Sequence, residues 1–290
     1  MFPLFDKAYK PSLMAQLLND EAALLIRQGD CEQAITHLIK ALRLYEGVAD
    51  SYEACSCHHC RLESCIARSK RTPVQNDCFF SPCLDESEQE VQRTANPTSS
   101  GYIYSQPIFC APTFSHEGHH PGVTLMMIII FNLALAHHLD SILPYQQARV
   151  LPFFSPPSSD PQRHHTRLGK ALQLYELFYQ LQMEREIFST QAMLAVANNV
   201  GEIHRIVGNQ IKYKLCLEHL MSCIMLVVED HRESSINQDL DSSSSRGVNG
   251  RVGRRSSHQH GDFSSRSEEM QGFLRNASKL VLHNNCAGAA

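Results

Sequence analysis

Cysteine and histidine residues gather in one short stretch of the chain. Cys55, Cys57 and Cys60 surround His58–His59, and Cys65 follows closely. Thiolate and imidazole ligands at such short spacing can surround a tetrahedral zinc ion. The spacing matches no standard zinc ribbon or finger, so we expect reduced thiols and no bound cofactor. A metal-binding or redox-responsive regulator that uses these four cysteines is the alternative function.

Sequence motifs of common enzymes are absent from the chain. The sequence has 16 histidines but no His-Glu-x-x-His pattern, which would place two metal ligands and a base on one helix. It also lacks a nucleotide-binding P-loop, a Gly-x-Ser-x-Gly elbow and a dinucleotide fingerprint. We therefore predict that the chain is not an enzyme.

Charge and hydropathy give further expectations about partners and location. The formal net charge is -4, which provides no general basic field for nucleic acid or for an anionic membrane. The apolar run over residues 123–131 is too short for a membrane-spanning helix, so we expect a buried helix there. The amino terminus does not resemble a secretory signal, which favours the cytoplasm or the nucleus.

The elements that would position any site are helices. Residues 12–45 carry apolar side chains at helical spacing and divide at Gly29–Asp30 into two helices, which predicts a hairpin. Gly29 suits a left-handed helix end, and Asp30 with Gln33 forms a capping-box pattern for the next helix. Ala22 and Ala34 are small where the two helices must approach closely.

Two later stretches follow the same register. In residues 187–231, Gly201 and Tyr213 are separated by 12 positions, as are Ala22 and Ala34, with a turn at 208–209. Residues 122–182 form another predicted hairpin, which a Pro/Ser-rich loop at 140–164 splits.

The remaining stretches are predicted to be insertions and a cap. Residues 46–121 are rich in Cys and Ser, residues 234–266 are rich in Ser and Arg, and both are expected to be disordered. A final amphipathic helix at 268–282 would cap the stack. The predicted fold is all-α, a short solenoid of helical hairpins with long insertions.

The hairpin pattern resembles the tetratricopeptide repeat over roughly half of the chain. The likeness rests on a small residue in the first helix, the Gly-Asp turn and the Ala-rich second helix, with Leu18 and Leu25 at the family's aromatic positions. The segments 102–104 and 131–138 are also similar to a group of uncharacterised algal repeat proteins, a likeness that implies no activity.

This resemblance implies a concave groove that binds a partner protein or peptide. An asparagine often holds the ligand backbone at the positions of Asn132 and Asn199, because an amide both donates and accepts hydrogen bonds. In this register His138 faces the groove and His137 packs. The predicted groove residues are Gln16, Asn19, Ala23, Arg27, Phe131, Asn132, Leu135, His138, Asn198, Asn199, Glu202 and Arg205.

The sequence therefore predicts a non-catalytic scaffold for protein-protein interaction. One alternative concerns the groove itself: the chain's own insertions can fill part of it, which would leave no conventional peptide site.

Overall fold

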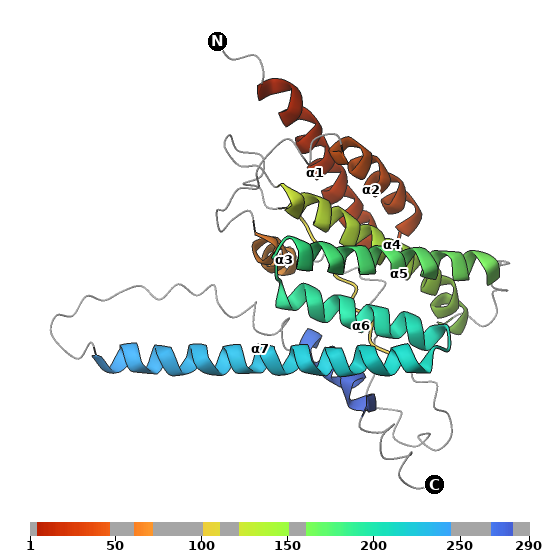
Figure 1. The fold of residues 1–290 in the computed structure, drawn as a ribbon. Helices are drawn as coiled ribbons and strands as arrows, with labels where there is room; N and C mark the ends of the chain where they lie inside the picture. Colours follow the sequence, from red (N-terminus) through yellow and green to blue (C-terminus); the bar gives the residue numbers. More distant parts are fainter. Residues whose placement is uncertain are drawn as a thin grey trace, which may run out of the picture. The chain divides into compact units, whose positions relative to one another are not determined.

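The computed structural model describes residues 5–46, 61–71, 101–110, 122–150, 161–244 and 268–280. All regular structure within these ranges is helical, which confirms the predicted all-α class. The helices are α1 (Phe5–Gln28), α2 (Cys31–Glu46), α3 (Leu62–Arg71), α4 (Val123–Val150), α5 (Pro161–Glu184), α6 (Thr190–Ile206), α7 (Gln210–Ser244) and a helix over residues 268–280 (Figure 1).

The chain divides into two compact units. Unit 1 comprises Met1–Ser100 and Ser105–Ser189, and unit 2 comprises Gly101–Tyr104 and Thr190–Ala290. The short segment 101–110 therefore begins in unit 2 and ends in unit 1.

Unit 1 contains two helical hairpins. α1 packs on α2, α2 packs on α4, and α4 packs on α5. Apolar residues at helical spacing face this interior because burying them removes apolar surface from water. Ala22 and Ala34, which we expected at the close approach of α1 and α2, are both completely buried.

The turn between α1 and α2 has the predicted chemistry. Gly29 has a φ of 84°, and the Asp30 N–H donates to the Leu25 carbonyl at 2.9 Å, which is the Schellman arrangement of a helix end. The Asp30 carboxylate accepts from the backbone N–H of Gln33 at 3.1 Å and from its side-chain amide at 2.6 Å. The Asp30 cap is therefore confirmed, but the reciprocal half of the capping box does not form, because the Asp30 backbone N–H donates to Leu25 and the Gln33 side chain bonds to the Asp30 carboxylate instead.

α4 is the most apolar helix of unit 1. Its stretch Val123–Ile142 is long and apolar enough to cross a membrane by length and composition, and 83% of the apolar window is buried inside the protein. Packing of α4 against both α2 and α5 accounts for this burial. Phe131 contacts two aromatic rings of α5, Tyr175 and Phe178, with ring centroids 6.1 and 5.4 Å away.

Unit 2 contains a third hairpin, formed by α6 and α7, and the helix 268–280. Its turn repeats the chemistry of the first: Gly208 has a φ of 76°, the Asn209 N–H donates to the His204 carbonyl at 2.9 Å, and the Asn209 side chain caps α7 at Lys212. A Cβ atom on Gly201 would lie 3.2 Å from that of Cys216, so the small residue permits close packing of α6 on α7.

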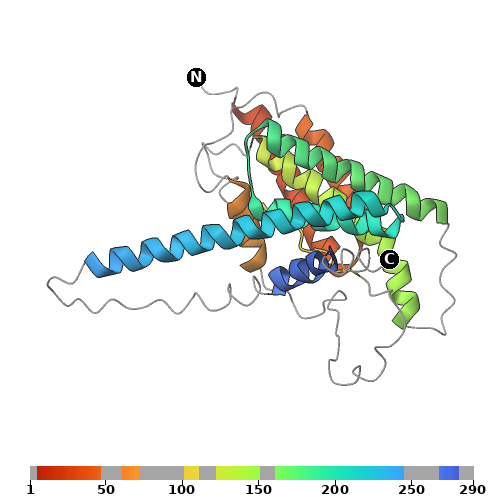
Figure 2. The ribbon, with the colours of Figure 1, turned by 60° about the horizontal axis from the view of Figure 1, so that its bottom comes forward.

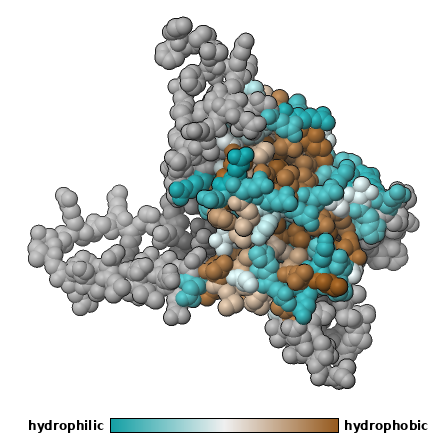
Figure 3. All heavy atoms as spheres, in the orientation of Figure 1, coloured by the Kyte–Doolittle hydropathy of each residue, from teal (hydrophilic) through white to brown (hydrophobic). Residues whose placement is uncertain are grey.

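α7 has one buried and one exposed face. Tyr213, Leu217 and Leu220 are buried, whereas large apolar side chains on other faces remain in contact with solvent. The exposed residues are Ile211, Leu215, Met225, Leu226 and Val228. Hydrophobic side chains among hydrophilic ones are visible on the face of the molecule drawn in Figure 3.

The structure corrects several predicted boundaries. The insertion 46–121 is not disordered throughout, because residues 62–71 form α3 and residues 101–110 are ordered and largely buried. The loop expected at 140–164 is shorter, since α4 continues to Val150 and α5 begins at Pro161. α7 continues to Ser244, into the predicted insertion 234–266. Helical hydrogen bonding thus extends beyond the apolar pattern that guided these boundaries.

Candidate peptide-binding site

An extended segment of the chain itself, residues 101–110, lies against the helices. It has no helix or strand assignment, and Tyr104 and residues 107–110 are buried. Buried backbone groups outside regular structure must find other hydrogen-bonding partners. Here asparagine side chains of the helices provide many of them.

In unit 1 the central contact joins Asn132 of α4 to Ile108. The Ile108 N–H donates to Asn132 Oδ1 at 2.8 Å, and Asn132 Nδ2 donates to the Ile108 carbonyl at 2.8 Å. Asn132 Nδ2 also donates to Asn19 Oδ1 at 2.9 Å, and Asn19 Nδ2 donates to the Ile108 carbonyl at 3.2 Å. Both asparagines are completely buried.

The end of the segment is fixed by α1 and α3. The Cys110 N–H donates to Asp20 Oδ1 at 2.8 Å, and its carbonyl accepts from Arg68 at 2.9 Å. The Phe109 N–H donates to the Ser69 hydroxyl at 2.7 Å. The guanidinium of Arg27 lies 4.6 Å from the centre of the Phe109 ring, a cation-π contact.

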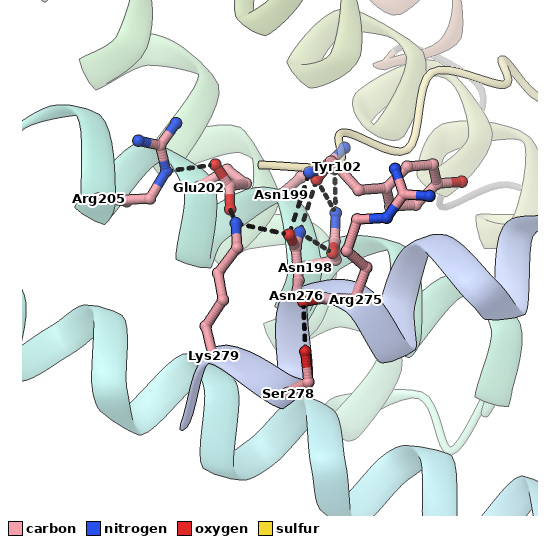
Figure 4. A network of polar contacts seen from close by, with 9 residues as sticks. All are labelled: Tyr102, Asn198, Asn199, Glu202, Arg205, Arg275, Asn276, Ser278 and Lys279. Atoms are coloured by element: carbon pink, nitrogen blue, oxygen red, sulfur yellow. Dashed lines mark hydrogen bonds and ion pairs between the residues drawn. The ribbon is translucent and has the colours of Figure 1, made fainter. Parts of the chain in front are cut away.

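In unit 2 the same pairing occurs twice. The Tyr104 N–H donates to Asn199 Oδ1 and Asn199 Nδ2 donates to the Tyr104 carbonyl, both at 2.9 Å. Asn276, on the helix 268–280, pairs likewise with Tyr102, at 3.0 Å for the accepted bond and 2.7 Å for the donated one. Asn198 adds a donated bond to the Tyr102 carbonyl at 3.0 Å (Figure 4).

The two tyrosine rings of this part of the segment contact Phe273 of the helix 268–280. The Tyr102 ring lies edge-on to Phe273 at 5.5 Å, and the Tyr104 ring stacks on Phe273 at 5.9 Å. Residues 101–104 and the dark-blue helix 268–280 lie side by side in both ribbon views (Figures 1 and 2). Recognition here therefore involves both the backbone and the rings.

A charged group borders the unit 2 contacts. Glu202 is only 1% exposed and accepts from Arg205 Nε at 2.6 Å, while Lys279 Nζ lies 3.7 Å from its other oxygen. Lys279 also donates to Asn276 Oδ1 at 3.1 Å. Two cations thus hold the carboxylate in place beside the segment, as Figure 4 shows.

Burial shifts the pKa of several groups at these contacts. It raises the pKa of Asp20, although the hydrogen bond from the Cys110 backbone works in the opposite direction. It raises the pKa of Tyr102, with a further contribution from the carboxylate of Glu269. It lowers the pKa of Lys279, which Glu202 opposes. All these shifts follow from removing the groups from water.

Several predicted groove residues contact the segment directly. Asn19, Asn132 and Arg27 do so in unit 1, and Asn198 and Asn199 do so in unit 2. An amide was expected to pair with both polar groups of an extended backbone, and the structure shows this pairing with the chain's own residues. Arg205 acts through Glu202.

Other predicted groove residues lie elsewhere. Leu135 is completely buried within α4, and Phe131 packs on α5. His138 was expected to face the groove, but it is completely buried with its ring edge-on to Tyr175 of α5, at 6.1 Å. The reason is that α4 packs on helices along more than one face, so little of its surface remains for a ligand. Burial lowers the pKa of His138 to about 3.

Much of this site is not apparent from the sequence. Asp20, Ser69 and Asn276 were not predicted, and Ile108 and Phe109 were not expected to act as an internal ligand. The sequence of residues 101–110 has no periodic pattern that would have indicated these contacts.

The alternative metal site is only partly within the described structure. Cys55, Cys57 and Cys60 lie outside the described residues, and Cys65 is completely buried in α3. Within the described ranges, no group of three His, Cys, Asp or Glu residues is arranged to hold a metal ion.

Comparison of the chain with protein-family models, curated proteins and solved structures gives no match. The tetratricopeptide resemblance therefore rests on the residues of this chain alone and remains a prediction.

Proposed function

We propose that this protein is a non-catalytic scaffold that binds an extended segment of a partner protein through asparagine side chains on its helices. One observation carries the proposal: Asn132, Asn199 and Asn276 each pair with both polar backbone groups of one residue in an extended segment.

This pairing is a general way to hold a peptide. Every non-proline residue offers one N–H and one C=O, so an amide that meets both groups binds the backbone without depending on the side chain. The three asparagines are at most 1% exposed, so water does not compete for these bonds. An asparagine left without its backbone partner would cost about 1–3 kcal/mol per buried group.

The segment 101–110 is then an internal ligand. A segment of the same chain competes with a partner at a high effective concentration, because binding it requires no association of two molecules. We therefore propose that partner binding requires displacement of at least residues 101–104 of this segment.

A released variant tests this function. The released variant is the full-length chain that carries Gly101→Val, Tyr104→Ser and Ile108→Ser together. These changes weaken the contacts of the internal segment in both units. A fluorescent peptide of residues 99–112 should bind this variant at least tenfold more tightly than it binds the wild-type chain, as measured by fluorescence anisotropy.

Further substitutions show whether the asparagines are responsible. Asn132→Ala and Asn199→Ala, each added to the released variant, should weaken binding of the peptide about tenfold or more, because each removes both bonds of one amide to the peptide backbone. Asn209→Ser is the matched control, since serine still caps α7 and Asn209 has no part in the segment contacts. Circular dichroism checks that each variant remains helical. Equal binding by the Asn132→Ala, Asn199→Ala and control variants would contradict the proposal.

A further inference from the structure

We propose that unit 2 selects a particular sequence, an extended Gly-Tyr-x-Tyr segment of a partner protein, where x is any residue. This inference rests on the proposed function and adds side-chain selectivity to it. The internal residues Gly101, Tyr102, Ile103 and Tyr104 show what each position requires.

The first position excludes a side chain. A Cβ atom built on Gly101 would overlap the carboxylate of Glu202. This carboxylate cannot move away without cost, because Arg205 and Lys279 hold it and it is 1% exposed. Only glycine permits this close approach.

The second position requires a ring that lies flat over a glycine. A Cβ atom on Gly272 would come within 2.6 Å of the Tyr102 ring, so the helix 268–280 provides space for the ring by lacking a side chain there. The edge-on contact with Phe273 defines one side of this space. Asn276 and Asn198 hold the backbone of the same residue.

The third position is permissive. Tyr102 and Tyr104, on either side of Ile103 in the sequence, both contact Phe273. Ile103 itself is only half-buried, and successive side chains of an extended chain point in opposite directions, so we expect this position to accept other residues.

The fourth position requires an aromatic ring. Tyr104 is only 3% exposed and its ring is nearly parallel to that of Phe273, at an interplanar angle of 16°. Phe273 is itself 1% exposed, so it is a fixed platform between the two tyrosines. Asn199 pairs with the Tyr104 backbone. Together the four positions define the motif.

Peptides with single changes test the motif. Labelled residues 99–106 are titrated with the released variant, alongside peptides that carry Gly101→Ala, Tyr102→Ala, Tyr104→Ala or Ile103→Lys. We expect the first three changes to weaken binding at least tenfold and Ile103→Lys to change it by less than about twofold. The wild-type chain, titrated at higher concentration, should give the same ranking and serves if the released variant does not fold.

A change in the receptor assigns the second position. Gly272→Ala should weaken the unchanged peptide strongly but leave the already weak Tyr102→Ala peptide almost unaffected, because the added methyl group meets only a ring. A general loss of structure would weaken both peptides equally, and that result would overturn the assignment.

The outcomes separate this inference from the proposed function. If all peptides bind equally but Asn199→Ala abolishes binding, backbone recognition stands and the motif is wrong. If no peptide binds either chain, the proposed function fails as well. Sedimentation gives a further test. If the wild-type chain is a dimer and the Gly101→Val variant is a monomer, the site binds a second copy of this chain, and the proposal of a different partner protein is wrong.

Discussion

The two ends of the segment 101–110 are held in different ways. In unit 1, Ile108, Phe109 and Cys110 are at most 6% exposed, and α1, α3 and α4 all contribute contacts. In unit 2, Gly101, Tyr102 and Ile103 are half-buried beside a group of charged residues. Both ends use paired asparagines, but in unit 2 only Tyr104 is fully buried, whereas all three residues of the unit 1 end are.

This difference indicates separate roles for the two ends. Removing Ile108 and Phe109 from unit 1 would expose apolar surface, at roughly 1.5–3 kcal/mol for each large side chain. The unit 2 end buries less of its surface, so its release costs less. We infer that residues 105–110 anchor the segment and that residues 101–104 exchange with a partner.

The largest effect is expected for Asn132→Ala. This change leaves the Ile108 N–H and carbonyl and Asn19 Oδ1 without a bond from Asn132 in a buried site, which should destabilise unit 1 by about 3 kcal/mol. Hydrogen exchange of the slow amides of α4 measures the loss. The matched variant in unit 2, Asn276→Ala, should destabilise α4 by less than about 0.5 kcal/mol. Equal effects of both changes on α4 would remove the distinction between the ends.

Acid should weaken unit 1 through its buried histidines. Burial lowers the pKa of His138 to about 3 and that of His137 to about 4, the latter also because Lys170 and Arg167 are nearby. Below pH 6.5 both imidazoles become protonated in the unfolded chain, whereas in the folded chain they stay neutral until a much lower pH. The two histidines should therefore not change the free energy of unfolding above pH 6.5. Below pH 6.5 each should lower it by up to about 1.4 kcal/mol per pH unit.

Replacing His138 isolates its contribution. His138→Leu should lower the slope of the unfolding free energy of α4 against pH by the equivalent of one proton between pH 6.5 and 4, as measured by hydrogen exchange. An unchanged slope would show that the imidazole is not the group responsible.

Loss of the capping side chain should have the same effect at the turns before α2 and α7, in contrast to the two ends of the segment. Asp30→Ala and Asn209→Ala each remove a side-chain cap from the following helix, which should cost about 1 kcal/mol in the unit concerned. Urea unfolding followed by circular dichroism measures both. A cost well above 2 kcal/mol for either variant would mean that the residue has a further role.

The sequence predicted the local features best. The Gly29–Asp30 turn was predictable because its hydrogen bonds join residues within five positions of one another. Asn132 and Asn199 were found through the repeat register, which places equivalent residues on equivalent helix faces. Helical periodicity also predicted the all-α fold.

The internal ligand was not predictable in the same way. Ile108 is 89 residues from Asn19, and Tyr102 is 174 residues from Asn276, so no local pattern reports their pairing. Residues 101–110 have neither a long apolar run nor a helical period. Their order depends on asparagines of distant helices, and α3 was missed because it lies within a polar stretch.

Hydrogen exchange of the wild-type chain, with and without an excess of the unlabelled peptide 99–106, shows whether the internal segment gives way to a ligand. We expect the amides of Tyr102 and Tyr104 to lose protection when the peptide takes their place, while the amide of Ile108 keeps its protection. If the Tyr102 and Tyr104 amides remain fully protected at saturating peptide, the segment is a permanent part of the fold and does not exchange with a partner.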